Sequence, residues 1–426
     1  MTAVTGLDFG RYKRMVQDFF ASEPRNDDAS SAVIWCLGRQ YASRSRGDID
    51  HEVSPTPGLD RGEQTPDQDA SKESSMGSRL DKKTGDGSMN SDGEYWEWPA
   101  DFLDDCESRI WMTYRSDFPP IMKSTEASMT LSVRLRSLAD KQGFTSDTGW
   151  GCMIRSGQCV LANALLLLRL GRMWRRGFRQ AEERTLLSLF ADDPKAAFSI
   201  HNFVQHGAQA CGKHPGEWFG PFATAKCIQA LTHAQEGINL RVYVNGDGAD
   251  VYEDKLLELA RSGQAHFTPT LILLGIRLGI DRVTPAYWEA LRASLEMPQS
   301  VGIAGGRPSS SHYFFAHQGN NFFYLDPHFT RSALALHSND ADYTTDEVES
   351  CHTRRLRRLP ITAMDPSMLL AFLIKDERDW HEWKEAMRAM PGKAIVHFAE
   401  TEPSLGTSGN ERQSALDEVE TFDDDE

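Results

Sequence analysis

The segment from Cys152 to Leu170 (CMIRSGQCVLANALLLLRL) limits the possible folds more than any other part of this 426-residue sequence. It predicts a helix, with Gly171 directly after it as a typical stop signal. Three residues upstream are candidate helix N-caps, namely Ser146, Asp147 and Thr148. A helix this apolar is stable only when other elements surround it, so we expect it to lie buried at the centre of the molecule.

Other segments predict strands around this helix. Residues 269–277 (PTLILLGIR) form an apolar run of strand length, and Tyr313–Ala316 and Asn321–Leu325 are separated by four residues that suit the loop of a β-hairpin. Asp379–Met390 carries two tryptophans three positions apart, as one face of a helix requires. We therefore expect an α/β or α+β architecture in which the buried helix packs on an antiparallel sheet.

Composition divides the chain into four parts. Residues 43–94 contain no Phe, Trp or Tyr and are rich in Ser, Gly, Asp, Lys and Pro, which predicts a disordered insertion. The apolar run before it, within residues 1–42, is expected to belong to the same folded unit as the main domain, residues 95–400. Residues 401–426 are predicted to be a flexible acidic tail, since the last sixteen residues hold eight acids and one arginine.

Charge and cysteine content exclude several classes of protein. The net charge of −16 would repel nucleic acid and anionic lipid headgroups. The seven cysteines include no CxxC pair, which argues against a disulfide framework or a cysteine-rich zinc module. No apolar run approaches the roughly 18 residues of a membrane span, and the N-terminus lacks the apolar core of a signal peptide. We expect a soluble protein of the cytoplasm.

Cys152 follows the sequence Thr-Gly-Trp-Gly and begins the predicted helix. A helix N-terminus stabilises a thiolate, lowering the thiol pKa from about 8.5, and its unpaired N–H groups can bind an oxyanion. Taken alone, Cys152 would be interpreted as an inert buried cysteine, which is a common role for this residue. Cys159 lies in the middle of the helix without such an environment, and we expect it to be a core residue.

A histidine and a carboxylate follow the predicted strand Asn321–Leu325. Residues two apart on an extended chain face the same side, so Asp326 can accept a hydrogen bond from Nδ1 of His328 and leave Nε2 for a thiol. Alone, the Asp-Pro-His sequence would be interpreted as a turn. Together with a glycine-flanked cysteine, it completes the Cys–His–acid set that acyl transfer requires.

Two weaker patterns point elsewhere. His201, His206, Cys211 and His214 could be imagined as a zinc site, but their spacings match no common zinc pattern. Gly302–Gly306 (GIAGG) lacks the spacing of a nucleotide-binding loop, and we interpret it as a mobile loop near the strand that precedes Asp326.

Six segments of the sequence resemble the autophagins, the cysteine peptidases of autophagy. They are SDTGWGCMIRSGQ at 146–158, HYFFAHQGNNFFYLDPH at 312–328, GEWFGP at 216–221, WCLGR at 35–39, WMTYR at 111–115 and DPS at 365–367. The resemblance covers nearly all of the chain outside the insertion and the tail. It implies an α+β, papain-like fold with a small added α/β subdomain, and no metal or organic cofactor.

The resemblance also implies roles for single residues. Cys152 matches the family's nucleophile, His328 its general base and Asp326 the carboxylate that orients the base. Tyr114 matches the tyrosine whose hydroxyl helps to form the oxyanion hole, although a tyrosine there could also be a plain core residue. Trp218 matches the tryptophan that covers the glycine tail of the substrate.

The loop around Gly305, Gly306, Arg307 and Pro308 matches a gate that lifts when substrate enters. The implied reaction is cleavage after the C-terminal glycine of a ubiquitin-like autophagy modifier, both in its precursor and in its phosphatidylethanolamine conjugate. The partners would be the free and conjugated modifier, with transient membrane contact through the substrate and possible recruitment to autophagosomal membranes. Alternatives are a papain-fold deubiquitinase, a transglutaminase-like acyl transferase, or an inactive module that only binds the modifier.

Overall fold

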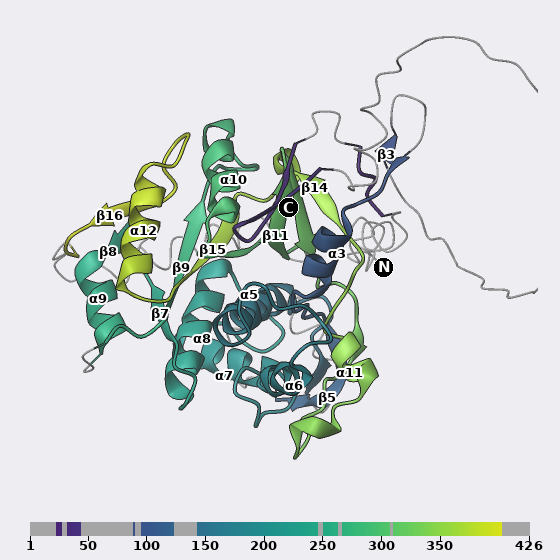
Figure 1. Ribbon diagram of the computed structural model, residues 1–426. Helices are drawn as coiled ribbons and strands as arrows, with labels where there is room; N and C mark the ends of the chain where they lie inside the picture. Colours follow the sequence, from purple (N-terminus) through teal and green to yellow (C-terminus); the bar gives the residue numbers. More distant parts are fainter. Residues whose placement is uncertain are drawn as a thin grey trace, which may run out of the picture.

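The computed structural model describes residues 23–27, 32–43, 88–89, 95–122, 143–245, 250–262, 266–306 and 310–402 (Figure 1). The predicted insertion and the acidic tail lie almost entirely outside these residues. Within the insertion, β3 (Ser88–Met89) pairs antiparallel with β4 (Tyr95–Trp96). The division into four parts therefore stays a prediction.

A nine-stranded sheet forms the centre of the described structure. Seven strands follow the order β14-β12-β11-β10-β15-β9-β7, and β1 adds to β11 and carries β2. Their bounds are β1 Ile34–Cys36, β2 Arg39–Tyr41, β7 Arg241–Val244, β9 Thr270–Arg277, β10 Ser300–Gly305, β11 His312–Gln318, β12 Asn321–Leu325, β14 Arg358–Pro360 and β15 Ser367–Ile374.

The sheet is antiparallel, as predicted, except where β7 runs parallel to β9. The parallel pair is possible because β8 (Asp250–Tyr252) and α9 (Glu253–Arg261) supply the crossover between the two strands. The predicted hairpin is present as β11 and β12, with β11 longer than expected at both ends.

The buried helix α5 spans Cys152–Arg169, one residue shorter than predicted, and every residue from Cys152 to Leu167 is buried. It packs against β10 and β11 of the sheet and against α6 (Gln180–Ser188), α7 (Ile200–Ala210) and α8 (Pro221–Ala234). Gly171 follows the helix with φ +89°, the left-handed conformation of a glycine stop.

Helices cover both faces of the sheet. Strands β10 and β15 are buried along their whole length, which requires cover on both sides. Figure 1 shows α5 to α8 gathered on one side, with α10 (Trp288–Glu296) on the other. Helix α12 (Glu377–Arg388) packs on β15 and buries both of its tryptophans, so the predicted helix is present, beginning and ending two residues earlier than expected.

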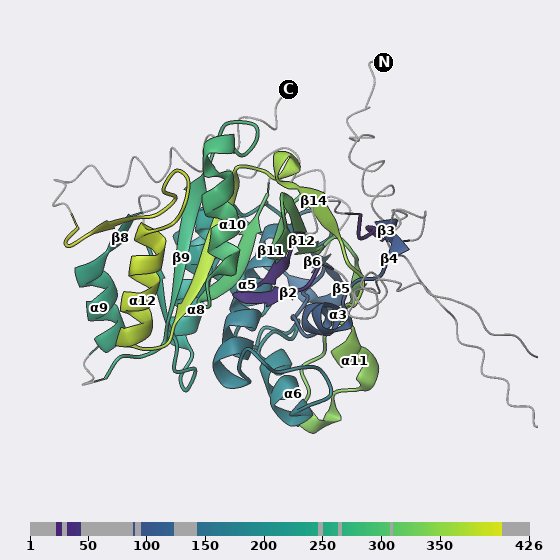
Figure 2. The same ribbon diagram turned by 45° about the horizontal axis from the view of Figure 1, so that its top comes forward.

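Smaller elements complete the described structure. A three-stranded sheet has the order β13-β5-β6, a two-stranded sheet joins β16 to β8, and Figure 2 shows α11 beside α6. Their bounds are α3 Ala100–Glu107, β5 Arg115–Ile121, β6 Phe144–Ser146, β13 Arg331–Ser332, α11 Thr345–Glu349 and β16 His397–Ala399. Among the described helices, none combines the length and apolarity needed to cross a lipid bilayer.

The seven cysteines were predicted not to form a disulfide framework. All seven lie in the described residues, and none forms a disulfide. Cys159 is buried in the core, as expected, where its thiol contacts the backbone of Met112.

Candidate active site

Cys152 is the first residue of α5, and its side chain is completely buried. The turn before it bends sharply, because Gly149 adopts φ +85° and Gly151 is the N-cap. The expectation that Ser146, Asp147 or Thr148 would cap the helix is wrong, since the N-cap is Gly151 and no side-chain cap is present in the described part of the chain. The N–H groups at this helix end are therefore not covered by a capping side chain.

Asp147 has a different task, because its carboxylate holds the turn in place. One oxygen accepts a hydrogen bond from the backbone N–H of Arg115 at 2.6 Å, and the other accepts from Nε of Arg155 at 2.7 Å. Arg155 also pairs with Asp192 at 2.9 Å. Burial raises the pKa of Asp147, whereas the two carboxylates keep the pKa of Arg155 above its ordinary value despite burial. The pairing compensates the cost of burying these charges.

This network also explains why a glycine precedes Cys152. A β-carbon at Gly151 would lie 2.4 Å from Oδ2 of Asp147, which is closer than any side chain can approach. The sequence analysis did not find the network. The only sign of the network in the sequence is that Asp147 lies eight residues before Arg155. That spacing predicts no contact, because the chain changes from a turn to a helix between the two residues.

Asp326 and His328 lie directly after β12, as predicted. The expected hydrogen bond is present, with 2.6 Å between Nδ1 of His328 and Oδ1 of Asp326. Two further bonds fix this turn: the Trp111 indole donates to the carbonyl of Asp326 at 2.7 Å, and the backbone N–H of Tyr114 donates to the carbonyl of Pro327 at 2.8 Å. The segment that carries Tyr114 thus positions both residues.

The structure brings Cys152 together with His328 and Asp326. Burial opposes every charge here, but the hydrogen bond to His328 and its charge hold the pKa of Asp326 well below its usual range. Burial alone would lower the pKa of His328, yet its bonds to Asp326 and Cys152 raise it to about 10. Burial would raise the pKa of Cys152, but His328 lowers it below its ordinary value. The arrangement favours a thiolate–imidazolium pair.

Tyr114 and Ser311 also face the thiol. The backbone N–H of Ser311 and the Tyr114 hydroxyl both help to lower the pKa of Cys152. The Tyr114 ring stands edge-on to His328, with 5.4 Å between centroids, and its buried hydroxyl makes no hydrogen bond of ordinary geometry within the described residues. Burial raises the pKa of this hydroxyl strongly, so it stays protonated and can donate. The sequence analysis did not identify Ser311.

His312 is a further residue of the site that the sequence analysis missed. Its Nε2 lies 4.0 Å from Oδ1 of Asp326, and its ring lies 5.4 Å from that of His328. Burial lowers the pKa of His312 to about 4, which keeps it neutral. Extending the predicted hairpin by one residue would have found it, because Tyr313 pairs with Leu325 and His312 is therefore opposite Asp326.

The metal-ligand pattern considered above does not form a site. In the described part of the chain, the three histidines and the one cysteine at positions 201 to 214 are not brought together, and Nε2 of His201 instead lies 2.6 Å from the carbonyl of Pro119. The side chains of metal-ligand type that do meet are those of His312, Asp326 and His328, with ligand atoms within 4.8 Å of one another. Asp326 is already hydrogen-bonded to His328, so a cation there would have to break that bond.

The structure corrects the prediction of a loop at Gly302–Gly306. The first four of these residues belong to the buried strand β10. The glycines among them are needed because neighbouring strands pass close by, and a β-carbon at Gly305 would lie 2.7 Å from the Cα of Met368 in β15. Gly306 leaves the strand with φ +144°, while Pro308 lies outside the described residues. The gate role of Gly305, Gly306 and Pro308 stays a prediction.

Trp218 lies in the segment before α8 and is half-buried against the core. Its indole N–H is buried and has no hydrogen-bond partner among the described residues. The role of Trp218 as a cover for substrate stays a prediction.

Known proteins resemble this chain over nearly its whole length. Residues 99–386 match the model of a protein family that is described as "Peptidase C54 catalytic domain". A relative from Botryotinia fuckeliana named "Probable cysteine protease atg4" is 57% identical over 440 residues, which cover 99% of this chain and 98% of that protein. The "Cysteine protease atg4" of Emericella nidulans is 52% identical over 417 residues, covering 97% of this chain and 96% of that protein.

Proposed function

This chain belongs to the peptidase C54 family, the autophagins, and on that premise we propose which bond it cleaves. It is a thiol peptidase of the autophagy pathway with a papain-like fold. Its proposed substrate is a ubiquitin-like autophagy modifier, cut after the C-terminal glycine. The cut matures the precursor and later releases the modifier from phosphatidylethanolamine.

The observation that carries the proposal is the contact of His328 with both Asp326 and Cys152 at the start of α5. The Cys152 thiolate attacks the carbonyl carbon of the glycine, and the His328 imidazolium gives its proton to the leaving amine. The neutral imidazole then takes a proton from water, whose oxygen attacks the thioester and releases a carboxylate. Asp326 keeps the imidazole in the required tautomer and orientation.

Tyr114 and the N-terminus of α5 supply the oxyanion hole in this proposal. The tyrosine hydroxyl already faces Cys152 and stays protonated, so it can donate to the oxygen that becomes negative during attack. Because Cys152 is completely buried, substrate has to displace covering groups before it can reach the thiol. We assign that cover to Trp218 and to the loop of residues 305–308, through which only a residue without a side chain could pass.

A reaction with purified components tests the proposal. The protein is incubated with the modifier precursor and, separately, with the phosphatidylethanolamine conjugate on vesicles. Both should be cleaved, and prior alkylation of Cys152 should stop both reactions. A Cys159→Ser variant is the matched control, since that thiol lies on the same helix in the core, and it should stay active. Cleavage that survives in Cys152→Ser would contradict the proposal.

The same assay separates the alternatives. A deubiquitinase would cleave ubiquitin ending in the same glycine, and a transglutaminase-like enzyme would incorporate an added amine instead of water. An inactive binding module would retain the modifier without cutting it. We further propose that the enzyme acts in the cytoplasm and reaches membranes only through its conjugated substrate, so vesicles that lack the conjugate should not sediment it.

A further inference from the structure

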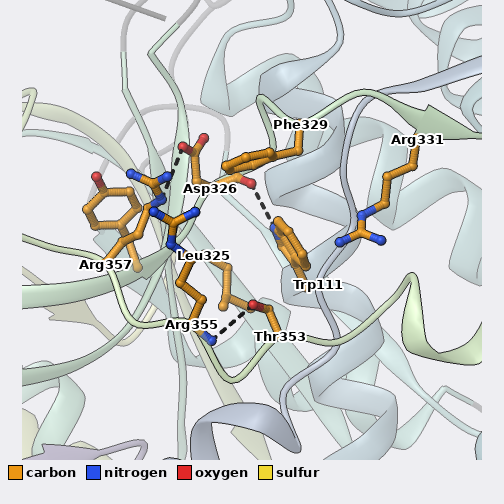
Figure 3. A pocket seen from close by; sticks show the side chains of 9 residues that line it. Trp111, Leu325, Asp326, Phe329, Arg331, Thr353, Arg355 and Arg357 are labelled. Carbon is orange, nitrogen blue, oxygen red and sulfur yellow. Dashed lines mark hydrogen bonds and ion pairs between the residues drawn. The ribbon is translucent and has the colours of Figure 1, made fainter. Parts of the chain in front are cut away.

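A hollow of about 150 Å³ lies beside the candidate triad, with Asp326 in its wall (Figure 3). Its walls come from the segment before β5, the end of β12 with the residues that follow it up to the start of β13, and the segment before β14. Nine residues line it: Trp111, Tyr324, Leu325, Asp326, Phe329, Arg331, Thr353, Arg355 and Arg357. We call it the arginine pocket.

The arginine pocket is positively charged in a chain whose net charge is −16. Arg331, Arg355 and Arg357 line it, and the only acid among the lining residues is Asp326. That carboxylate is already hydrogen-bonded to His328. Figure 3 shows Arg355 and Arg357 on one side and Arg331 on the other, with Trp111 and Phe329 between them.

Two of these guanidinium groups are held in place by aromatic rings. Arg357 lies 5.3 Å from the ring centre of Phe329, and Arg331 lies 4.9 Å from that of Trp111. Such stacking fixes the plane of a guanidinium group and leaves its N–H groups pointing sideways.

Both guanidinium groups keep buried N–H groups that lack an acceptor in the described part of the chain. The Arg357 side chain is only 10% exposed, and its nearest acid is Asp326 at 3.9 Å, beyond hydrogen-bond distance. One terminal nitrogen of Arg357 and Nε of Arg331 are buried without a hydrogen-bond partner. Burial also lowers the pKa of Arg331. Unsatisfied, positively charged donors are costly unless an acceptor visits them.

We propose that the arginine pocket binds a phosphate group. A phosphate can accept hydrogen bonds from several guanidinium groups at once, each in the two-pronged geometry that arginine favours. The Thr353 hydroxyl adds another donor to the same space. Arg355 also lies 4.0 Å from Glu23, so the unsatisfied donors that a ligand would meet are those of Arg331 and Arg357. The pocket has room for a phosphate together with a short substituent.

Two sources of phosphate are compatible with this chemistry. One is the headgroup phosphate of the lipid-conjugated modifier, which rests on the proposed function. The other is free phosphate, and binding of free phosphate does not depend on the proposed function. In either case the bound group competes with Asp326 for Arg357, which links occupancy of the pocket to the triad.

Binding is tested with inorganic phosphate on the full-length protein by titration calorimetry, at constant ionic strength adjusted with chloride. The wild type should show saturable binding. Arg355→Gln and Arg331→Gln should each weaken it about tenfold, the effect of losing one charged hydrogen bond. Arg354→Gln is the matched control, because Arg354 neighbours the pocket in sequence but pairs with Asp104 and Glu107 outside it. Its affinity should equal that of the wild type.

Kinetics then identify the source. If the lipid headgroup is the ligand, Arg355→Gln should slow release from phosphatidylethanolamine several-fold more than it slows precursor cleavage. If free phosphate is the ligand, added phosphate should change both rates alike, and only in proteins with an intact pocket. Absence of saturable binding in the wild type, or equal binding by Arg355→Gln and Arg354→Gln, would overturn the proposal. Because the titration needs no turnover, it stands even if the proposed substrate is wrong.

Discussion

Cys152 combines complete burial with a lowered pKa. Burial alone would keep the thiol protonated, so its ionisation depends on His328, whose own ionisation depends on Asp326. The charged state of the nucleophile is therefore a property of three residues together. Each can be removed separately, and the consequences differ.

The first prediction concerns the pH dependence of Cys152. Alkylation by iodoacetamide should proceed at mildly acidic pH, and His328→Ala should move its midpoint upward, because the stabilising cation is lost. Asp326→Ala leaves the imidazole present, so it should reduce turnover more than it shifts alkylation. The measurement is the alkylation rate from pH 4 to 11. A wild-type midpoint near that of an ordinary thiol, about 8.5, would exclude the ion pair.

The second prediction concerns the alkaline side of the pH–turnover profile. His328 keeps its proton until the pH rises through about 10, and turnover needs that proton for the leaving amine. Turnover should therefore fall near pH 10, while alkylation, which needs only the thiolate, stays on its plateau. The two profiles should be recorded on the same preparation. A parallel decline of both would show that the protein unfolds or that a different acid acts.

The third prediction concerns Gly151. An alanine there would place its β-carbon against Oδ2 of Asp147, so it should destabilise the protein by about 1–3 kcal/mol and reduce turnover by displacing Cys152. Gly275→Ala in β9 is the control, because its β-carbon meets nothing within 4 Å. Urea unfolding of both variants measures the cost. Equal stabilities would contradict the argument about the turn.

Among the elements, α5 depends on a close approach to α8. Gly157 faces Thr224, and a β-carbon at Gly157 would lie 2.3 Å from the Thr224 methyl group. This contact holds α5 and α8 close together. A sequence pattern predicts that α5 is buried, but the identity of its partner helix depends on tertiary packing.

The fourth prediction tests this contact. Gly157→Ala should destabilise the protein by about 1–3 kcal/mol through overpacking, although alanine is the better helix former. Thr224→Ser removes the clashing methyl group, so the double variant should recover most of the loss. A double-mutant cycle from urea unfolding gives the coupling energy. If the free-energy changes of the two substitutions simply add, the cost of Gly157→Ala does not come from its contact with Thr224, and the prediction is wrong.

At the scale of the whole molecule, Asn26 connects the two ends of the predicted insertion. Its side-chain amide donates to the carbonyl of Ser43 at 2.7 Å and to that of Glu97 at 3.4 Å. The chain therefore enters and leaves the folded domain at one place. Because these two ends lie close together, a short linker could join them in place of the residues between.

The fifth prediction follows from that geometry and from the absence of aromatic residues in 43–94. Replacing residues 44–87 by a short Gly/Ser linker should leave the melting temperature and the cleavage of soluble precursor near those of the wild type. The companion variant is Asn26→Ala in the full chain, which removes the hydrogen bonds from Asn26 to Ser43 and Glu97. A collapse of thermal stability in the deletion variant would show that the segment belongs to the fold.

The sequence predicted the parts of the site that local rules govern. Cys152 at a helix start and the pair Asp326 and His328 at a strand end are visible in spacing alone. His312 and the support of Asp147 by Arg155 were missed because they depend on register and on contacts between distant segments. The arginine pocket was missed for the same reason, since its walls come from three separate stretches.

The position of β15 determines when this enzyme can become active during its synthesis. Residues 367–374 form a central strand between β10 and β9, so the sheet has no continuous centre until they have been made. The ribosome releases Cys152 long before His328, and in that interval the cysteine is an ordinary thiol. The nascent chain therefore has an unactivated nucleophile during that interval, and a truncation before Ser367 would remove β15 and leave a sheet divided into two halves.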